Sequence, residues 1–265
     1  MNNIFKMLMI VLIVTMLACN KSKTQESANE TDTVQVQESS TTKLLKQMKD
    51  DDGSYVTIEH DEQGRIVKLA YYSGDKFEYS RTITYDETNN SVWVESKPAE
   101  GEQEFADGEI NYEKREQNKI FYELGNAWSL MTINNAGYIL TDSNDWHRAG
   151  ERHDYKYDYQ DGKLTSKTSS VFIENELQSE VVSNFNYDDK RSPFFSDETP
   201  IWLLQQLFEG FGLKNNLIYI SDNVVDVSYE YEFDSNGYPT KRTRILEHGG
   251  IVEYMVTNYD YGIMK

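Results

Sequence analysis

The chain has 265 residues, with 45 Asp and Glu against 26 Lys and Arg, and its formal net charge is −19 at pH 7. Nucleic-acid phosphates repel a chain this acidic, and it has no basic patch to bind them, which excludes DNA and RNA as partners. Its 19 Tyr, 11 Phe and only 4 Pro favour pleated sheet over disorder. The acidic surplus would suit a cationic ligand, but it is more typical of a soluble surface that resists aggregation.

The start of the chain has the layout of a secretory signal peptide. Lys6 supplies a positive charge, and residues 7–17 form an almost unbroken apolar run. The run is too short for a permanent membrane helix, which needs about 20 apolar residues. It ends in Met16-Leu17-Ala18-Cys19, which resembles the lipobox of bacterial lipoproteins, with methionine where leucine is usual. The resemblance implies that residues 1–18 are removed and that Cys19, the only cysteine, carries a lipid that anchors the chain to a membrane.

Residues 19–42 are predicted to be a flexible polar tether. They are rich in Ser, Thr, Gln, Glu and Lys, so they cannot bury enough apolar surface to offset the entropy lost on ordering. The segment Asn20-Lys21-Ser22-Lys23 lacks an early acidic cluster that would resemble a surface-export signal. We therefore expect the domain to face the periplasm at the outer membrane, with cell-surface exposure as the alternative. Residues 43–265 are predicted to form a single β-rich domain.

An aromatic residue followed by aspartate recurs along this domain. Most copies are separated by one or two units of about 24 residues, and such a unit accommodates two strands and two turns. The clearest copies are Tyr85-Asp86, Tyr157-Asp158, Tyr187-Asp188, Phe233-Asp234 and Tyr259-Asp260.

Each unit has the sequence of a β-hairpin. In residues 227–233, Val, Tyr, Tyr and Phe alternate with Ser, Glu and Glu, which is typical of a half-buried strand. The following Asp234-Ser235-Asn236-Gly237 provides a side-chain acceptor and a glycine for positive φ, which is the chemistry of a tight turn. Residues 61–64 and 134–137 repeat this turn. Returning strands are predicted at 65–69, 138–141 and 163–166.

One stretch has a helical rather than a strand period. Its apolar residues are spaced for an amphipathic helix near 199–211, with Thr199 as N-cap, Pro200 at the first helical position and Gly210 or Gly212 at the end. We expect this helix to pack its apolar face, including Trp202, against the sheet. A shorter helix is predicted over 42–48.

The arrangement of these motifs resembles known families. The fullest repeat, residues 231–241, resembles the tyrosine-aspartate repeats of large bacterial surface and toxin proteins. In the order of its motifs, the chain is similar to a family of Bacteroidota lipoproteins of unknown function with a porin-like fold. These motifs are a strand and turn at 185–194, a helical insert, Lys214-Asn215-Asn216 and a closing hairpin. The likeness extends over residues 50–261. It implies an all-β antiparallel meander, barrel-like or strongly curved, and brings no established activity with it.

The alternation in these strands differs from that of a membrane pore. Segments such as 155–159 and 229–232 alternate Tyr with charged residues, whereas a transmembrane barrel needs a continuous outward apolar band. We expect a water-soluble barrel or curved sheet.

Candidate metal and catalytic motifs are weak. His147 and His153, beside Asp145 and Asp154, are possible metal ligands that meet only if the chain turns between them, and surface loop histidines are far commoner. The sequence has no phosphate loop, serine elbow or free cysteine nucleophile, and it implies no cofactor. A carboxylate pair for glycoside hydrolysis cannot be picked out of 45 acidic residues, because the separation that matters is spatial.

Exposed aromatic residues are candidates for ligand binding, with inward-facing core positions as the alternative reading for each. The candidates are Trp93, Trp128, Trp146, Tyr71 and Tyr72.

Three functions follow from these observations. The first is a non-catalytic, lipid-anchored module that binds a glycan, a peptide or an envelope protein, and it predicts a groove with clustered aromatics. The second is a carbohydrate hydrolase, which predicts two carboxylates about 5 to 10 Å apart in a cleft. The third is a purely structural interaction protein with an exposed sheet edge or apolar patch. Oligomeric state is left open.

Overall fold

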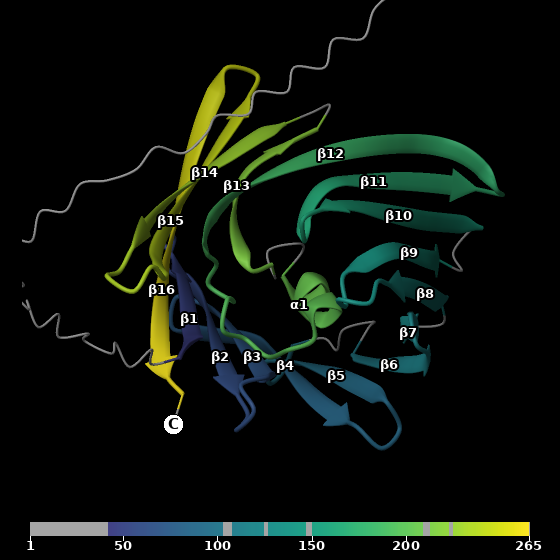
Figure 1. Ribbon diagram of the computed structural model, residues 1–265, viewed down its shortest axis with the longest axis horizontal. Helices are drawn as coiled ribbons and strands as arrows, with labels where there is room; N and C mark the ends of the chain where they lie inside the picture. The colour runs from purple at the N-terminus through teal and green to yellow at the C-terminus, as the bar shows by residue number, and fades with distance from the viewer. Residues whose placement is uncertain are drawn as a thin grey trace, which may run out of the picture. The chain divides into compact units, whose positions relative to one another are not determined.

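The domain is a closed antiparallel barrel. The computed structural model describes residues 42–102, 108–124, 127–146, 150–208, 213–222 and 225–264. Within these ranges sixteen strands pair in chain order, and the last strand pairs with the first (Figure 1). The predicted all-β antiparallel meander is confirmed, and of the two geometries left open by the sequence, the closed barrel is the one formed.

The strands follow one another around the barrel with short turns between most of them. The first eight are β1 Lys43–Asp50, β2 Ser54–His60, β3 Ile66–Ser73, β4 Lys76–Asp86, β5 Ser91–Pro98, β6 Glu109–Glu116, β7 Lys119–Leu124 and β8 Ala127–Ile133. The next eight are β9 Ile139–Trp146, β10 Glu151–Gln160, β11 Lys163–Ile173, β12 Glu176–Arg191, β13 Asn215–Ser221, β14 Asp226–Phe233, β15 Pro239–His248 and β16 Ile251–Ile263. The helix α1, Ile201–Leu207, lies between β12 and β13 in the sequence.

The repeated aspartate forms the turns as its sequence predicts. Asp234 Oδ1 accepts hydrogen bonds from the backbone N–H groups of Asn236 and Tyr238, at 2.9 and 3.0 Å. Gly237 has φ of 78°, a conformation that costs little only for glycine. The copy after Asp86 lacks a glycine, and there Asn90 adopts φ of 51° instead. Asparagine tolerates this region better than other side chains do, so the turn survives.

The outer wall of the barrel carries charged side chains. Lys241 on β15 pairs with Glu232 on β14 at 2.7 Å between Nζ and Oε1, and Lys68 on β3 pairs with Glu59 on β2 at 3.2 Å. These side chains are all more than a third exposed, so each pair contributes at most about 1 kcal/mol. These ion pairs show that charged side chains face outward on strands whose alternate residues point into the barrel.

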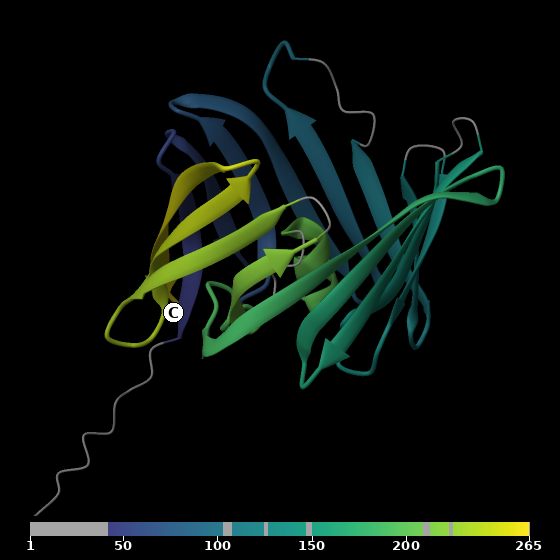
Figure 2. The same ribbon diagram turned by 90° about the horizontal axis from the view of Figure 1, so that it is seen from above.

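Helix α1 lies inside the ring of strands (Figures 1 and 2). Leu203 is fully buried, and Trp202, Leu204, Gln205 and Leu207 are nearly so. The tryptophan and the three leucines join inward-facing residues of the barrel wall in one hydrophobic core. Part of the barrel interior is therefore filled by a helix rather than by strand side chains alone.

The predicted helix near 199–211 is confirmed in position, but its start differs. Pro200 is the N-cap, and no side chain caps the helix. Thr199 Oγ1 instead accepts a hydrogen bond from the backbone N–H of Ile66 at 2.7 Å, so it ties the segment before the helix to β3. Gly210 and Gly212 lie outside the described residues.

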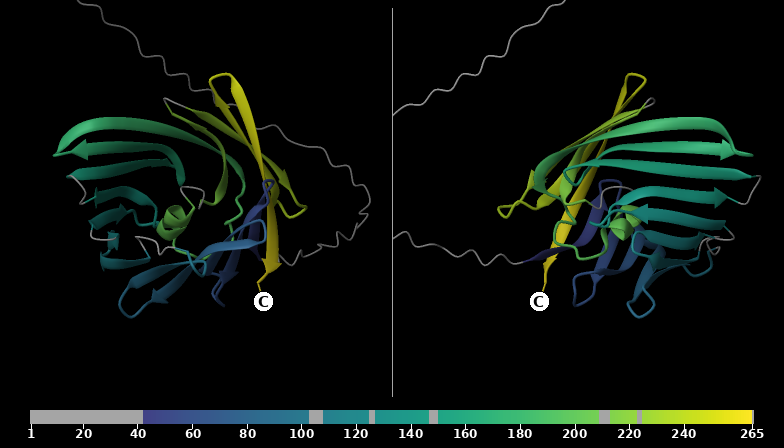
Figure 3. Two further views of the ribbon diagram at one scale, coloured as in Figure 1. Left: turned by 180° about the vertical axis from the view of Figure 1, so that it is seen from behind. Right: turned by 45° about the vertical axis from the view of Figure 1, so that its right-hand side comes forward.

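The predicted helix over 42–48 is wrong, because this segment belongs to β1. Leu45 and Met48, three residues apart, both contact the core, which mimics a helical period. The register with β16 shifts between Leu45 and Gln47, and this bulge brings side chains three apart onto one face of a strand. Figure 3 shows β1 beside β16, where the barrel closes.

The predicted signal peptide, Cys19 and nearly all of the predicted tether lie outside the described residues. Within the described ranges, no helix is long and apolar enough to cross a membrane.

Candidate functional site

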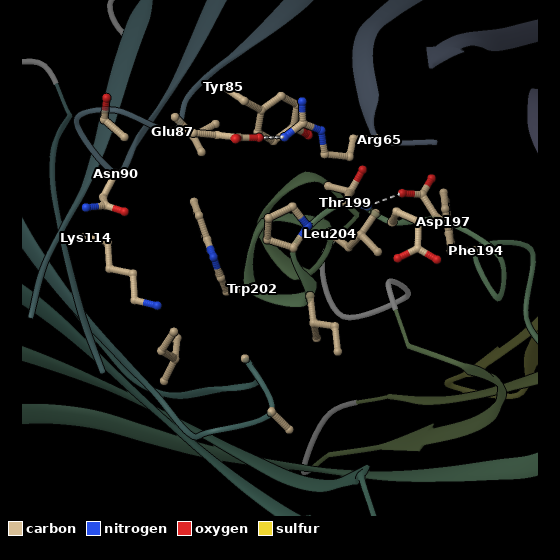
Figure 4. A pocket seen from close by; sticks show the side chains of 18 of the residues that line it. Arg65, Tyr85, Glu87, Asn90, Lys114, Phe194, Asp197, Thr199, Trp202 and Leu204 are labelled. Atoms are coloured by element: carbon tan, nitrogen blue, oxygen red, sulfur yellow. Dashed lines mark hydrogen bonds and ion pairs between the residues drawn. The ribbon is translucent and has the colours of Figure 1, made fainter. Parts of the chain in front are cut away.

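A cavity of about 580 Å³, here called the helix cavity, lies between α1 and the turns at one end of the barrel. Its volume falls within the range of about 300–1,000 Å³ that is usual for small-molecule sites. Residues from the β4–β5 turn, the β8–β9 turn and the segment before α1 line it (Figure 4). The labelled lining residues are Arg65, Tyr85, Glu87, Asn90, Lys114, Phe194, Asp197, Thr199, Trp202 and Leu204.

Polar side chains fix α1 to the neighbouring strands β9 and β10. Gln205 Oε1 accepts a hydrogen bond from the backbone N–H of Ile139 at 3.1 Å, and its Nε2 donates to the Tyr159 hydroxyl at 2.9 Å. Gln206 Nε2 donates to Asp142 Oδ2 at 3.2 Å. Because these bonds are buried or partly buried, they hold the helix in one orientation and with it the side chains that it presents.

Trp202 is the largest aromatic group on the helix cavity. Its ring packs against Tyr112, with 5.2 Å between centroids, and only 8% of the residue is exposed. Figure 4 shows Asn90 and Lys114 beside it. Within the described residues these two side chains have no hydrogen-bond or ion-pair partner, so their polar groups are available to a ligand.

Arg65 forms a fixed polar wall of the cavity. Its guanidinium lies 4.2 Å from the centroid of the Tyr85 ring, and it contacts Asp61 at 2.8 Å and Glu87 at 3.0 Å. Partial burial works to raise the pKa of Asp61, but the hydrogen bonds and positive charge of Arg65 outweigh it and lower that pKa. The pair therefore stays ionised, and the arginine holds the tyrosine ring in place.

A buried histidine–aspartate pair secures the segment that leads into α1. His60 Nε2 lies 3.0 Å from Asp197 Oδ2, and the two side chains are 2% and 3% exposed. Asp197 Oδ1 also accepts a hydrogen bond from the backbone N–H of Thr199 at 2.8 Å. The chain is thereby attached to the end of β2, directly beside the helix cavity.

Three of the four carboxylates that line the helix cavity are held by structural contacts, and within the described residues the fourth, Glu198, has no hydrogen-bond or ion-pair partner for its side chain. Asp86 accepts hydrogen bonds from Asn89, which lower its pKa, and Glu87 and Asp197 are engaged by Arg65 and His60. Such contacts suit fixed architecture better than a paired general acid and base.

Asp142 is a further buried carboxyl, and it does not line the helix cavity. Burial raises its pKa, and it accepts a hydrogen bond from the Tyr122 hydroxyl at 2.7 Å.

The structure separates the aromatic residues singled out from the sequence. Trp93 lies on β5 and is 38% exposed. Tyr71 lines a second cavity, and Tyr72 stacks on Tyr55 with 4.4 Å between ring centroids. Trp128 and Trp146 belong to β8 and β9, but their side chains lie outside the described residues. Ligand binding by these five residues stays a prediction.

His153, the described one of the two histidine candidates, does not line the helix cavity. His153 lies on β10 with Nε2 2.7 Å from Glu151 Oε1, and His147 is not among the described residues. In the described part of the chain no three His, Cys, Asp or Glu side chains gather as a metal site.

Sequence reasoning missed the residues that form the helix cavity. The sequence predicts helix packing for Trp202, while Asn90 in the β4–β5 turn and Lys114 on β6 have no distinguishing pattern. The available signal was a tryptophan on a short helix that interrupts an otherwise regular meander.

Comparison with known proteins confirms the fold. No family model and no curated protein sequence matches the chain. A porin-like protein from Bacteroides uniformis ATCC 8492 matches with a TM-score of 0.50 and 14% identity over 84% of this chain and 96% of its own. A porin-like protein from Bacteroides vulgatus ATCC 8482 matches with a TM-score of 0.51 and 12% identity over 83% and 99%. The barrel has a porin-like fold. At identities of 14% and 12%, the likeness to these two structures concerns the fold alone and says nothing about function.

Proposed function

We propose that the chain is a lipid-anchored protein of the cell envelope that binds a glycan in the helix cavity without altering it chemically. The observation that carries the proposal is Trp202, held at a cavity of about 580 Å³ beside the polar side chains of Asn90 and Lys114. A large aromatic group with a few convergent polar groups is the usual composition of a small-ligand site.

The chemistry of this cavity suits a sugar. A sugar ring has an apolar C–H face that packs on an aromatic ring, and hydroxyl groups at its edge that pair with amides and charged groups. Trp202 supplies the aromatic group, Asn90 supplies both a donor and an acceptor, and Lys114 supplies donors. The rigid Arg65 and Tyr85 pair keeps the opposite wall in place, which limits the entropy lost on binding.

Envelope location is supported by the predicted signal peptide and by the surface of the barrel. The sequence up to Cys19 resembles a lipoprotein signal, and the matched structures are described as porin-like proteins of Bacteroides. A membrane-spanning barrel needs an outward apolar band about 25 Å tall. Exposed ion pairs within strands, such as those of Lys156 with Asp158 on β10 and Lys97 with Glu95 on β5, place charges where such a band needs apolar groups, which supports a tethered barrel in water.

The anchor is tested by replacing Cys19 with Ser. The variant lacks the thiol that accepts the lipid, so we expect the protein to move from the detergent phase of a Triton X-114 partition to the aqueous phase. Wild-type protein from the same cells is the reference. Retention of Cys19→Ser in the detergent phase would contradict the proposed lipid anchor.

Sugar binding is tested with Trp202→Leu and the matched control Trp93→Leu. Saturation-transfer NMR with cellobiose, maltose and chitobiose is expected to show binding of at least one disaccharide to the wild type. Loss of the aromatic contact in Trp202→Leu should weaken that binding about five- to tenfold. Trp93→Leu, on the outer wall and outside the helix cavity, should leave binding in this cavity unchanged, and a loss in this variant alone would assign the contact to Trp93 instead.

Two results would count against this function. If none of the three disaccharides binds, or if both tryptophan variants weaken binding equally, Trp202 is not the ligand contact. If monosaccharide signals accumulate during the measurement, the protein is a hydrolase and the non-catalytic assignment is wrong.

A further inference from the structure

A second cavity, of about 350 Å³, lies inside the barrel and is here called the arginine cavity. Phe194 lines both cavities and so forms part of the wall between them. Arg81 comes from β4 and Arg242 from β15, on opposite sides of the β1–β16 closure. The remaining charged or aromatic lining residues are Tyr71, Tyr79, Phe208, Tyr231 and Tyr259.

The charge of the arginine cavity is opposite to that of the whole chain. The chain has a net charge of −19, yet none of the described lining residues is Asp or Glu. Arg81 forms no ion pair with any carboxylate in the described ranges. A cationic group in a cavity with low-dielectric walls attracts anions more strongly than the same group on an exposed surface.

Arg242 is oriented by a neighbouring hydroxyl. Its Nη2 donates to Thr257 Oγ1 at 3.0 Å, and Thr257 Oγ1 donates to Asp50 Oδ1 at 2.6 Å. Thr257 therefore links the guanidinium to the carboxylate of Asp50. The position of the guanidinium is set by the barrel wall before any ligand arrives, which favours tight recognition of an anion.

Aromatic rings flank the arginines. Tyr71 and Tyr79 stack with 4.1 Å between centroids and 11° between planes, and the Arg81 guanidinium lies 6.0 Å from the Tyr79 ring. Burial raises the pKa of Tyr71 and of Tyr259 to about 12, so both phenols stay neutral at pH 7. They can face an anion without repelling it and can donate hydrogen bonds to it.

One acceptor in the cavity wall has no partner. Asn216 is 1% exposed, its Nδ2 donates to Asp188, and its Oδ1 has no hydrogen-bond partner within the described residues. A buried acceptor left in this way costs free energy unless a donor reaches it. A ligand hydroxyl would supply that donor.

We propose that the arginine cavity is a second binding site, specific for a small hydroxylated ring that carries a carboxylate or a phosphate. The arginines take the oxyanion, the tyrosines pack on the ring, and Asn216 accepts from a hydroxyl. A neighbouring cavity of about 250 Å³ shares Met48, Tyr71 and Arg242 with it and reaches Ser54 and Tyr55 at the start of β2. In this proposal the ligand reaches the site through the neighbouring cavity, from the end of the barrel opposite the helix cavity.

The site is tested by titrating the full-length lipoprotein in detergent with glucuronate, glucose 6-phosphate and glucose, using calorimetry. At least one of the two anions should bind about tenfold or more tightly than glucose, and added salt should weaken it. Whichever anion binds better distinguishes a carboxylate ligand from a phosphate ligand. Arg81→Gln should reduce the anion affinity by about tenfold or more, and Arg81→Lys by less, since lysine keeps the charge but not the two-pronged geometry.

Three controls separate this site from other effects. Arg115→Gln removes the same charge from an exposed position and should change nothing. Trp202→Leu should leave anion binding intact, so that failure of the glycan proposal would not affect this one. Met48→Trp fills the space shared by the two connected cavities without removing charge, and it should abolish binding while circular dichroism shows the barrel intact.

Any of three outcomes overturns the proposal. The first is that glucose binds as tightly as both anions. The second is that the anion affinity is unchanged in Arg81→Gln and Met48→Trp although both variants are folded. The third is that neither anion binds the wild type at millimolar concentration.

Discussion

Replacing Leu203 with Ala is expected to lower the free energy of unfolding by about 2–5 kcal/mol. Leu203 is completely buried in the middle of α1 and belongs to the core shared by the helix and the barrel wall. The substitution removes buried methyl groups and leaves a void that strands linked by continuous hydrogen bonding cannot easily collapse to fill. Urea denaturation followed by circular dichroism measures the loss.

The matched control for Leu203 is Leu140 on β9, which is 37% exposed. Leu140→Ala is expected to change the free energy of unfolding by less than about 0.5 kcal/mol. Equal effects of the two substitutions, or a loss below 1 kcal/mol for Leu203→Ala, would show that α1 contributes little to the stability of the barrel.

Replacing His60 with Leu is expected to cost about 1–3 kcal/mol of unfolding free energy, despite the gain of an apolar side chain. The change leaves Asp197, which is 3% exposed, with the Thr199 N–H but without the hydrogen bond from His60. A buried carboxylate that loses a partner retains its desolvation cost. Urea titration at pH 7 gives the value.

The double variant His60→Leu and Asp197→Leu distinguishes the lost pair from simple crowding. The double variant should be less destabilised than the sum of the two single variants, because the loss of the His60–Asp197 contact is then counted once, although the Thr199 N–H also loses its acceptor. A double variant as unstable as the sum of the two single ones would show that the pair contributes nothing as a pair. Such a result would leave Thr199 and the glutamines of α1 as the attachments of the helix.

Local chemistry made the hairpins predictable from the sequence. Asp234 and Gly237 determine their turn by their own side-chain and backbone preferences, and the alternation before them shows which residues face inward. Closure of the barrel was not predictable in this way. It depends on pairing Lys43 with Ile263, at opposite ends of the domain, and no local pattern specifies contact between residues so far apart.

The two cavities could not be predicted from the sequence for the same reason. Arg81 and Arg242 come from strands far apart in the sequence that approach each other only when β1 meets β16. The error over residues 42–48 was local instead. The bulge between Leu45 and Gln47 gives a strand the spacing of a helix, and only pairing partners outside the segment identify it as β1.

The pairing of β1 with β16 also determines which end of the barrel the two outermost strands share. Lys43, at the start of β1, contacts Asp234 in the β14–β15 turn, and it therefore lies at the end of the barrel that holds the helix cavity. At the same end, the backbone N–H of Met264 donates to the Thr42 carbonyl at 3.0 Å. The junction of the first and last strands thus borders the turns that line the helix cavity, so a change that loosens this junction acts on the cavity end of the barrel and not on the opposite one.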